Sequence, residues 1–131
     1  MFADDYPRFI EVSELTPDLS PEDQRIRNRS ALEQRNRMSE RYEALFASNR
    51  DIFDGARVLD LASHDGRFSM AALHAGAAHV TGVEVRQSLV DKAQETFEFY
   101  GRDPETYRFV CGDERNPVSY THLTLPTICS V

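Results

Sequence analysis

Three acidic residues stand at the ends of short apolar runs of the chain: Asp60, Glu84 and Asp113. A carboxylate after the second run can accept hydrogen bonds from both hydroxyls of a ribose, and one after the third can accept from an exocyclic amine. Each acid also has a structural interpretation, since Asp60 and the nearby Asp65 can cap a following helix and Asp113 can lie in a Gly-Asp turn. Their recurrence at three successive run ends favours an adenosine-binding site.

The elements that position these acids alternate between strands and helices. β-prone runs cover residues 57–61, 79–83 (ending at Glu84) and 107–111, and helical patterns cover residues 67–75 and the stretch before Gly101. Strands joined by helices of this length pair in parallel through right-handed crossovers. The sequence thus predicts an α/β fold, the first half (β-α-β-α-β) of a Rossmann-like doubly wound parallel sheet. Ligands of such sheets bind beyond the carboxyl ends of the strands.

Helical segments precede this sheet. Residues 1–19 have no sustained period and are interpreted as an irregular arm, and residues 20–50 as an N-terminal helical segment. The latter begins with a capping box from Ser20 to Asp23 and is interrupted near Asn36. Its later part is amphipathic, because apolar side chains recur there at helical spacing: Met38, Tyr42, Leu45 and Phe46. Ser88 and Asp91 match a second capping box.

The short runs and the loop after the first of them resemble the first three motifs of class I S-adenosylmethionine-dependent methyltransferases. The matching stretches are VLDL at residues 58–61, GRF at 66–68, VTGVE at 80–84 and FVCGD at 109–113. The resemblance covers residues 40–115 and implies S-adenosylmethionine as the cofactor. It places Asp60 and Gly66 by the methionine part of the cofactor, Glu84 on the ribose and Asp113 by the adenine amine. Residues 51–115 are accordingly interpreted as a partial cofactor-binding domain.

The loop after residue 61 departs from the family's Gly-x-Gly-x-Gly pattern. Ala62 and His64 stand at the first two glycine positions, and only Gly66 remains. Glycine permits positive φ and a close approach of the ligand to the backbone. Alanine costs little there if its φ is negative, and histidine tolerates the left-handed region better than most residues. We therefore keep Ala62 and His64 among the predicted cofactor-binding residues.

Two alternatives remain open at this point. A nicotinamide dinucleotide oxidoreductase has the same fold, but its Gly-x-Gly-x-x-Gly fingerprint keeps only one glycine of three here. A non-catalytic adenosine-binding or interaction module, with the helix of residues 20–46 as its contact surface, belongs to a different class. No metal site is predicted, because the four histidines show no ligand spacing.

The last residues, 116–131, are uncharged and unlike the rest of the chain. The run from Val118 resembles a tail that recurs on truncated automated translations, and residues 116–131 are interpreted as non-native. The chain would then end before the fourth strand of the family, leaving residues 58–61 as an unpaired edge that favours self-association. Residues 120–125 are β-prone and offer an added strand as the alternative. We expect a truncated and inactive methyltransferase, with its catalytic residues and its methyl acceptor (small molecule, RNA or protein) undefined by this sequence.

Composition limits the compartment and the partners. The chain of 131 residues has a formal net charge of −7, and no stretch approaches the roughly 20 apolar residues of a membrane span. Its acidic N-terminus is no signal peptide, and two cysteines are too few for a disulfide framework. A cytoplasmic protein without membrane contact is expected. Residues 24–50 carry seven arginines against three acids, which leaves nucleic acid open as a partner.

Overall fold

A computed structural model describes residues 2–10, 20–112 and 127–129 of the chain. The chain divides into two compact units, Met1–Leu45 and Phe46–Val131. Within the described ranges, every helix is too short or too polar to cross a membrane. The candidate site lies wholly in the second unit.

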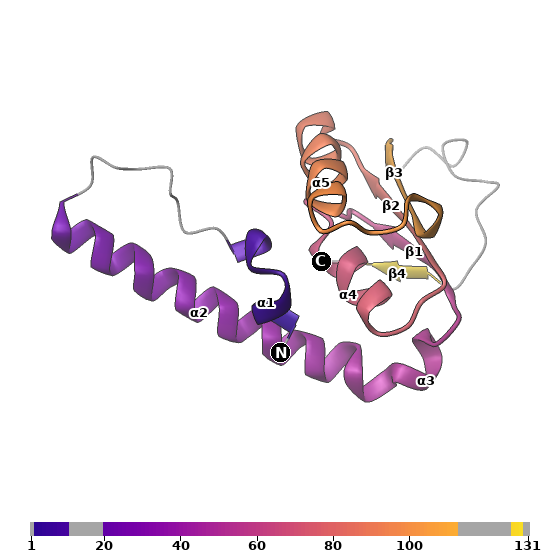
Figure 1. Ribbon diagram of the computed structural model, residues 1–131, viewed down its shortest axis with the longest axis horizontal. Coiled ribbons are helices and arrows are strands. Elements are labelled where there is room, and N and C mark those ends of the chain that lie inside the picture. The colour runs from indigo at the N-terminus through magenta and orange to yellow at the C-terminus, as the bar shows by residue number, and fades with distance from the viewer. Residues whose placement is uncertain (1, 11–19, 113–126, 130–131) are drawn as a thin grey trace. The chain divides into compact units, whose positions relative to one another are not determined.

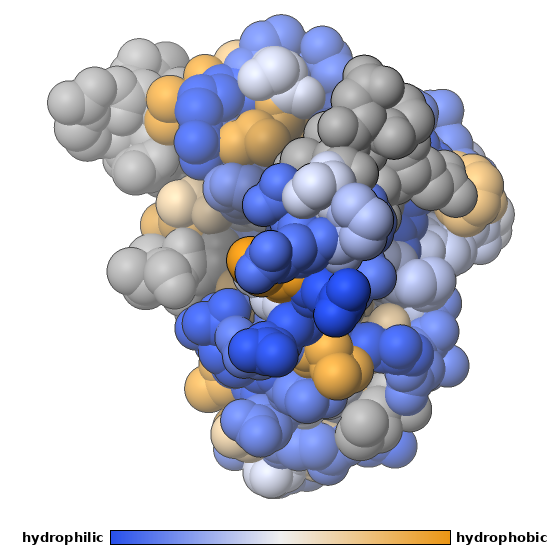
Figure 2. Space-filling view, turned by 90° about the vertical axis from the view of Figure 1, so that its left-hand side faces the viewer, coloured by the Kyte–Doolittle hydropathy of each residue, from blue (hydrophilic) through white to orange (hydrophobic). Residues whose placement is uncertain are grey.

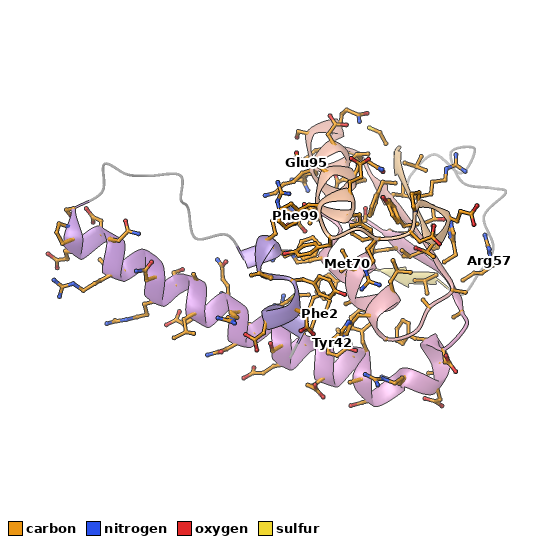
Figure 3. The ribbon with its side chains drawn as sticks, in the orientation of Figure 1. Phe2, Tyr42, Arg57, Met70, Glu95 and Phe99 are labelled. Carbon is orange, nitrogen blue, oxygen red and sulfur yellow. The ribbon has the colours of Figure 1, made fainter. Side chains whose placement is uncertain are left out.

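The first unit contains helices where the sequence suggested an irregular arm. Helix α1 (Phe2–Asp5) and the 3-10 turn η1 (Pro7–Ile10) precede the long helix α2 (Pro21–Leu45), while residues 11–19 lie outside the described part. The ring of Phe2 stacks on that of Tyr42 with centroids 5.2 Å apart (Figure 3). Asp4 of α1 also pairs with Arg35 of α2. These tertiary contacts order a segment too short to show a helical period.

Helix α2 begins as the sequence predicts, because the Ser20 hydroxyl accepts a hydrogen bond from the Asp23 N–H at 3.2 Å. It is continuous, so the predicted break near Asn36 is wrong; asparagine lowers helix propensity by less than about 1 kcal/mol. Leu45 is 54% exposed, unlike Tyr42, and therefore does not belong to the predicted apolar face. Figure 2 shows a surface on which hydrophilic residues dominate and hydrophobic ones are scattered.

The second unit is built on a parallel sheet with the order β3-β2-β1-β4 (Figure 1). Strands β1 (Arg57–Leu61), β2 (His79–Glu84) and β3 (Tyr107–Cys111) lie within a residue of their predicted bounds. Helix α4 (Arg67–His74) packs on β1 and β2, and helix α5 (Gln87–Phe99) packs on β2 and β3. Short helical turns complete the unit: η2 (Ala47–Asn49), α3 (Arg50–Phe53) and η3 (Pro104–Thr106). The predicted α/β fold with β-α-β-α-β order is confirmed.

Two local expectations about this unit are wrong. Strand β4 (Thr127–Cys129) pairs in parallel with Leu59, Asp60 and Leu61, so these residues are not an unpaired edge. The exposed N–H and C=O groups of β1 provide a template that a β-branched segment can extend. The alternative added strand at residues 120–125 lies outside the described residues. Helix α5 starts one residue before Ser88, and Asp91 accepts from the Gln87 side-chain amide instead of closing a capping box.

The core between the sheet and its helices is aromatic on the side of β3. The ring of Phe97 contacts Tyr107 and Phe109 with centroids 4.8 and 4.7 Å away. Gly82 of β2 lies under this cluster, where an added Cβ would come within 2.7 Å of the Phe109 ring and 2.8 Å of the Ser63 hydroxyl. The glycine of β2 thus lets the loop after β1 lie directly against the sheet.

Candidate functional site

The loop after β1 and the end of β2 form one hydrogen-bonded structure. The N–H of Ser63 donates to the carbonyl of Val83 at 3.0 Å, and the N–H of Gly66 donates to the carbonyl of Ser63 at 2.9 Å. These bonds hold the loop beside the carboxyl end of β2, the place where ligands of parallel sheets bind. The predicted residues Ala62, His64, Gly66 and Glu84 are therefore brought together.

Glu84 is the centre of this arrangement. Only 3% of the residue is exposed. Its Oε1 accepts from the N–H of His64 at 3.2 Å and from Nη2 of Arg86 at 3.3 Å. Its Oε2 accepts from the N–H and from Nε of Arg86 at 2.8 and 3.1 Å. Burial alone would raise the pKa of this carboxyl, but the Arg86 hydrogen bonds outweigh burial and lower the pKa. Glu84 is therefore a carboxylate at neutral pH.

The loop after β1 has the left-handed backbone that usually requires glycine, although Ala62 and His64 stand at two of the three positions. Ala62 has φ 57° and His64 has φ 54°, both in the left-handed region, and Gly66 has φ 86°. Alanine would cost little at this position if its φ were negative, but the φ of Ala62 is positive. Left-handed backbone costs a residue with a Cβ roughly 1–2 kcal/mol. The hydrogen bonds to Val83 and Glu84 keep the loop in this conformation.

This strain predicts that Ala62→Gly stabilises the protein. Relief of the left-handed penalty exceeds the extra chain entropy of glycine, and we expect the free energy of unfolding to rise by about 0.5–1 kcal/mol. Urea unfolding measures the change. Ala71→Gly is the control, because Ala71 lies in the right-handed backbone of α4 and glycine there lowers stability. A loss of stability in Ala62→Gly would contradict the assigned strain.

Asp60 and Asp113 are placed differently from Glu84. The Asp60 side chain is buried, and its Oδ2 accepts from the Ser69 hydroxyl of α4 at 2.7 Å. This contact fixes α4 to β1; a role of Asp60 toward a cofactor stays a prediction. Asp113 lies outside the described residues. The N–H of Gly112 donates to the carbonyl of Glu84 at 3.0 Å, which brings the chain just before Asp113 next to the end of β2.

Sequence reasoning missed two arginines of this site. Asp65 is 2% exposed and accepts from Arg67 through Nη2 at 2.7 Å, Nε at 3.0 Å and the backbone N–H at 3.3 Å. Burial opposes ionisation of Asp65, but the hydrogen bonds and charge of Arg67 dominate and lower its pKa. Glu84 and Arg86 make the same set of bonds. The signal in the sequence is an acid followed two residues later by arginine, which occurs at both places.

The Asp65–Arg67 pair predicts a pH-dependent stability. A carboxyl whose pKa is lower in the folded state stabilises it above the pKa of the unfolded chain, near 4, and this contribution disappears as the pH falls through the folded pKa. We expect Asp65→Asn to lower the free energy of unfolding by about 1–3 kcal/mol at pH 7 and by less at pH 3. Urea unfolding at both pH values tests this, with the exposed Asp51→Asn as control. A deficit of equal size at both pH values would rule out the carboxylate charge as its cause.

Two further kinds of ligand site come into question among the described residues: a hollow on the surface and groups of metal-ligating side chains. A hollow of about 380 Å³ is lined by residues 50, 51, 54 and 74–76, which precede β1 and β2, so it lies at the amino ends of the strands and away from Glu84. Among the described residues, no three His, Cys, Asp or Glu side chains are close enough together to hold a metal ion.

No protein-family model and no curated protein matches the sequence. Solved structures match the fold. A protein of Pyrococcus horikoshii assigned as an RNA methyltransferase has 28% identity and a TM-score of 0.50, over 60% of this chain and 38% of that one. Protein arginine methyltransferase 10 of Arabidopsis thaliana has 24% identity and a TM-score of 0.60, over 80% and 29%. The chain has the class I methyltransferase fold. A protein of Escherichia coli assigned as a methyltransferase agrees, with 21% identity and a TM-score of 0.50, over 55% and 40%.

The methyltransferase fold confirms the resemblance inferred from the motifs. This chain spans 38%, 29% and 40% of the length of the three structures. S-adenosylmethionine is the cofactor that the fold implies, and the residues present fit it, because the buried carboxylate of Glu84 lies at the carboxyl end of β2 beside the loop after β1. The comparisons support neither the nicotinamide oxidoreductase nor the non-catalytic interaction module.

Proposed function

We propose that this chain forms the cofactor-binding part of an S-adenosylmethionine-dependent methyltransferase. The observation that carries the proposal is Glu84, an ionised and nearly buried carboxylate at the carboxyl end of β2, held against the loop after β1. Glu84 would accept hydrogen bonds from the two ribose hydroxyls of the cofactor. The cofactor-binding set is Asp60, Ala62, His64, Gly66, Glu84 and Asp113.

Each part of the site has a separate task in binding. The loop of residues 62–66 is proposed to lie along the methionine portion of the cofactor. Gly66 lets α4 start close to α5, and Asp113 is proposed to accept from the adenine amine. S-adenosylmethionine, when bound, supplies an electrophilic methyl group. Its transfer requires an acceptor atom aligned with that methyl, and none of the residues above is assigned to this alignment.

The acceptor is proposed only as a class. Small molecules, RNA and proteins all remain candidate methyl acceptors. The Pyrococcus protein is named as an RNA methyltransferase and the Arabidopsis protein as a protein arginine methyltransferase. The cytoplasm is the proposed compartment, on the basis of the low cysteine content. Self-association through an unpaired edge of β1 is less strongly supported, because residues 59–61 of β1 already pair with β4.

Isothermal titration calorimetry with S-adenosylhomocysteine, the demethylated product, tests the proposal. We expect saturable binding to this chain and no measurable binding of NAD, since the loop lacks two of the three glycines that let a backbone approach pyrophosphate. Saturable NAD binding together with no heat from S-adenosylhomocysteine would reverse the assignment in favour of the oxidoreductase.

A further inference from the structure

The hydrogen-bonding capacity of the Glu84 carboxylate is used completely by the chain itself. A carboxylate offers about four lone-pair positions, two on each oxygen. Backbone N–H groups of His64 and Arg86 take one position on Oε1 and one on Oε2. The Arg86 guanidinium takes the other two, with Nη2 on Oε1 and Nε on Oε2. A ribose therefore finds no open acceptor position on Glu84 in this conformation.

The four donors differ in how easily they can leave. The backbone donors belong to the loop after β1 and to the turn that starts α5, so they are fixed by the fold. The Arg86 side chain is 58% exposed, against 4% for that of Glu84, and it is held by the carboxylate from the solvent side. An exposed ion pair contributes little to stability, because water solvates the guanidinium almost as well. The guanidinium is thus the donor that a ligand can replace.

The guanidinium also has the bonding pattern of the ligand that would replace it. Its fork gives one N–H to each carboxylate oxygen, as planar arginine–carboxylate pairs do. A cis-diol offers two O–H donors side by side and can likewise give one to each oxygen. The two positions that become open when the side chain leaves are those that a ribose diol needs.

We propose that the Arg86 guanidinium occupies the ribose position of Glu84 in the ligand-free protein and is an internal competitor of the cofactor. The inference rests on the function proposed above and adds a residue that sets the affinity of that site. A protein whose binding-competent state is only partly populated binds with an affinity reduced by that fraction. Removal of the competitor should therefore tighten binding, opposite to the effect of removing a ligand-binding residue.

Calorimetry with S-adenosylhomocysteine on the full chain tests this with Arg86→Ala, which removes the guanidinium and keeps the backbone N–H. We expect a dissociation constant lower by about two- to fivefold, the range that an exposed ion pair supplies. Arg57→Ala is the matched control, because Arg57 is an exposed arginine at the amino end of β1 (Figure 3) and its loss changes the charge equally. The 2′-deoxy analogue of the ligand should gain less from Arg86→Ala, since it uses only one of the two vacated positions.

A second readout needs no ligand. NMR titration of the Glu84 carboxyl in the ligand-free protein should give a higher pKa in Arg86→Ala than in the parent and in Arg57→Ala. An unchanged pKa of Glu84 in Arg86→Ala would show that the Arg86 guanidinium does not pair with the Glu84 carboxylate in the ligand-free protein. A raised pKa with unchanged or weaker S-adenosylhomocysteine binding would overturn the competition, and weaker binding would make Arg86 a cofactor ligand instead. A raised pKa with no binding to the parent or to the variant would show that the proposed function itself is wrong.

Discussion

Glu84→Ala is expected to weaken S-adenosylhomocysteine binding by at least a hundredfold. The proposed ribose contacts are two charge-assisted hydrogen bonds to a carboxylate that is 3% exposed. Each such bond contributes about 1.5–3 kcal/mol, so the loss of both amounts to about 3 kcal/mol or more, and every 1.4 kcal/mol corresponds to a tenfold change in affinity. Among the predicted site residues that the structure describes, Glu84 should therefore give the largest effect on affinity.

Calorimetry of the parent and of two variants makes this measurable. Glu95→Ala is the control, since Glu95 is an exposed acid on α5 (Figure 3) and its removal changes the net charge equally. Glu84→Gln keeps the shape and one acceptor oxygen, and should bind with an intermediate affinity. Urea unfolding of each variant separates loss of binding from loss of folding, because Glu84 also accepts from His64. Parent-like affinity in a folded Glu84→Ala protein would contradict the site assignment.

The sheet and the position of Glu84 were predictable from local pattern. The runs at residues 57–61 and 107–111 are β-prone, and the Asp54-Gly55 and Gly112-Asp113 pairs bound them. Glu84 follows the second run without an intervening turn signal, which places it at the strand end. The spacing of apolar residues and the turn-forming residue pairs are local properties of the sequence, and they were sufficient to predict a parallel α/β sheet.

The loop conformation was not predictable, because tertiary contacts determine it. The sequence shows that Ala62 and His64 replace glycines, but their positive φ follows from the bonds that join the loop to Val83 and Glu84 across the sheet. Helix α1 is likewise ordered by the contact of Phe2 with Tyr42, forty residues along the chain. Such long-range contacts leave no trace in the local pattern of either segment.

The second large effect is expected from Gly66→Ala, which should lower the free energy of unfolding by about 2–5 kcal/mol. Gly66 has φ 86°, so alanine adds a left-handed strain of roughly 1–2 kcal/mol. The new Cβ would also lie 3.1 Å from the Ala93 Cβ, 3.1 Å from Cε1 of Phe97 and 3.2 Å from Cζ of Phe109. These neighbours belong to the core under α5, and overpacking of a core costs typically 1–3 kcal/mol.

Gly101→Ala separates the two causes of this loss. Gly101 has φ 66°, but nothing lies within 4 Å of the position of an added Cβ, so alanine there costs the strain alone. Urea unfolding should therefore show Gly66→Ala as the less stable of the two variants by the overpacking contribution. Equal losses would mean that the core around Gly66 can move aside. Gly66→Ala should also weaken S-adenosylhomocysteine binding in the protein that stays folded, because the close contacts of the new Cβ shift residue 66, whose N–H closes the loop onto Ser63 and thereby positions His64 beside Glu84.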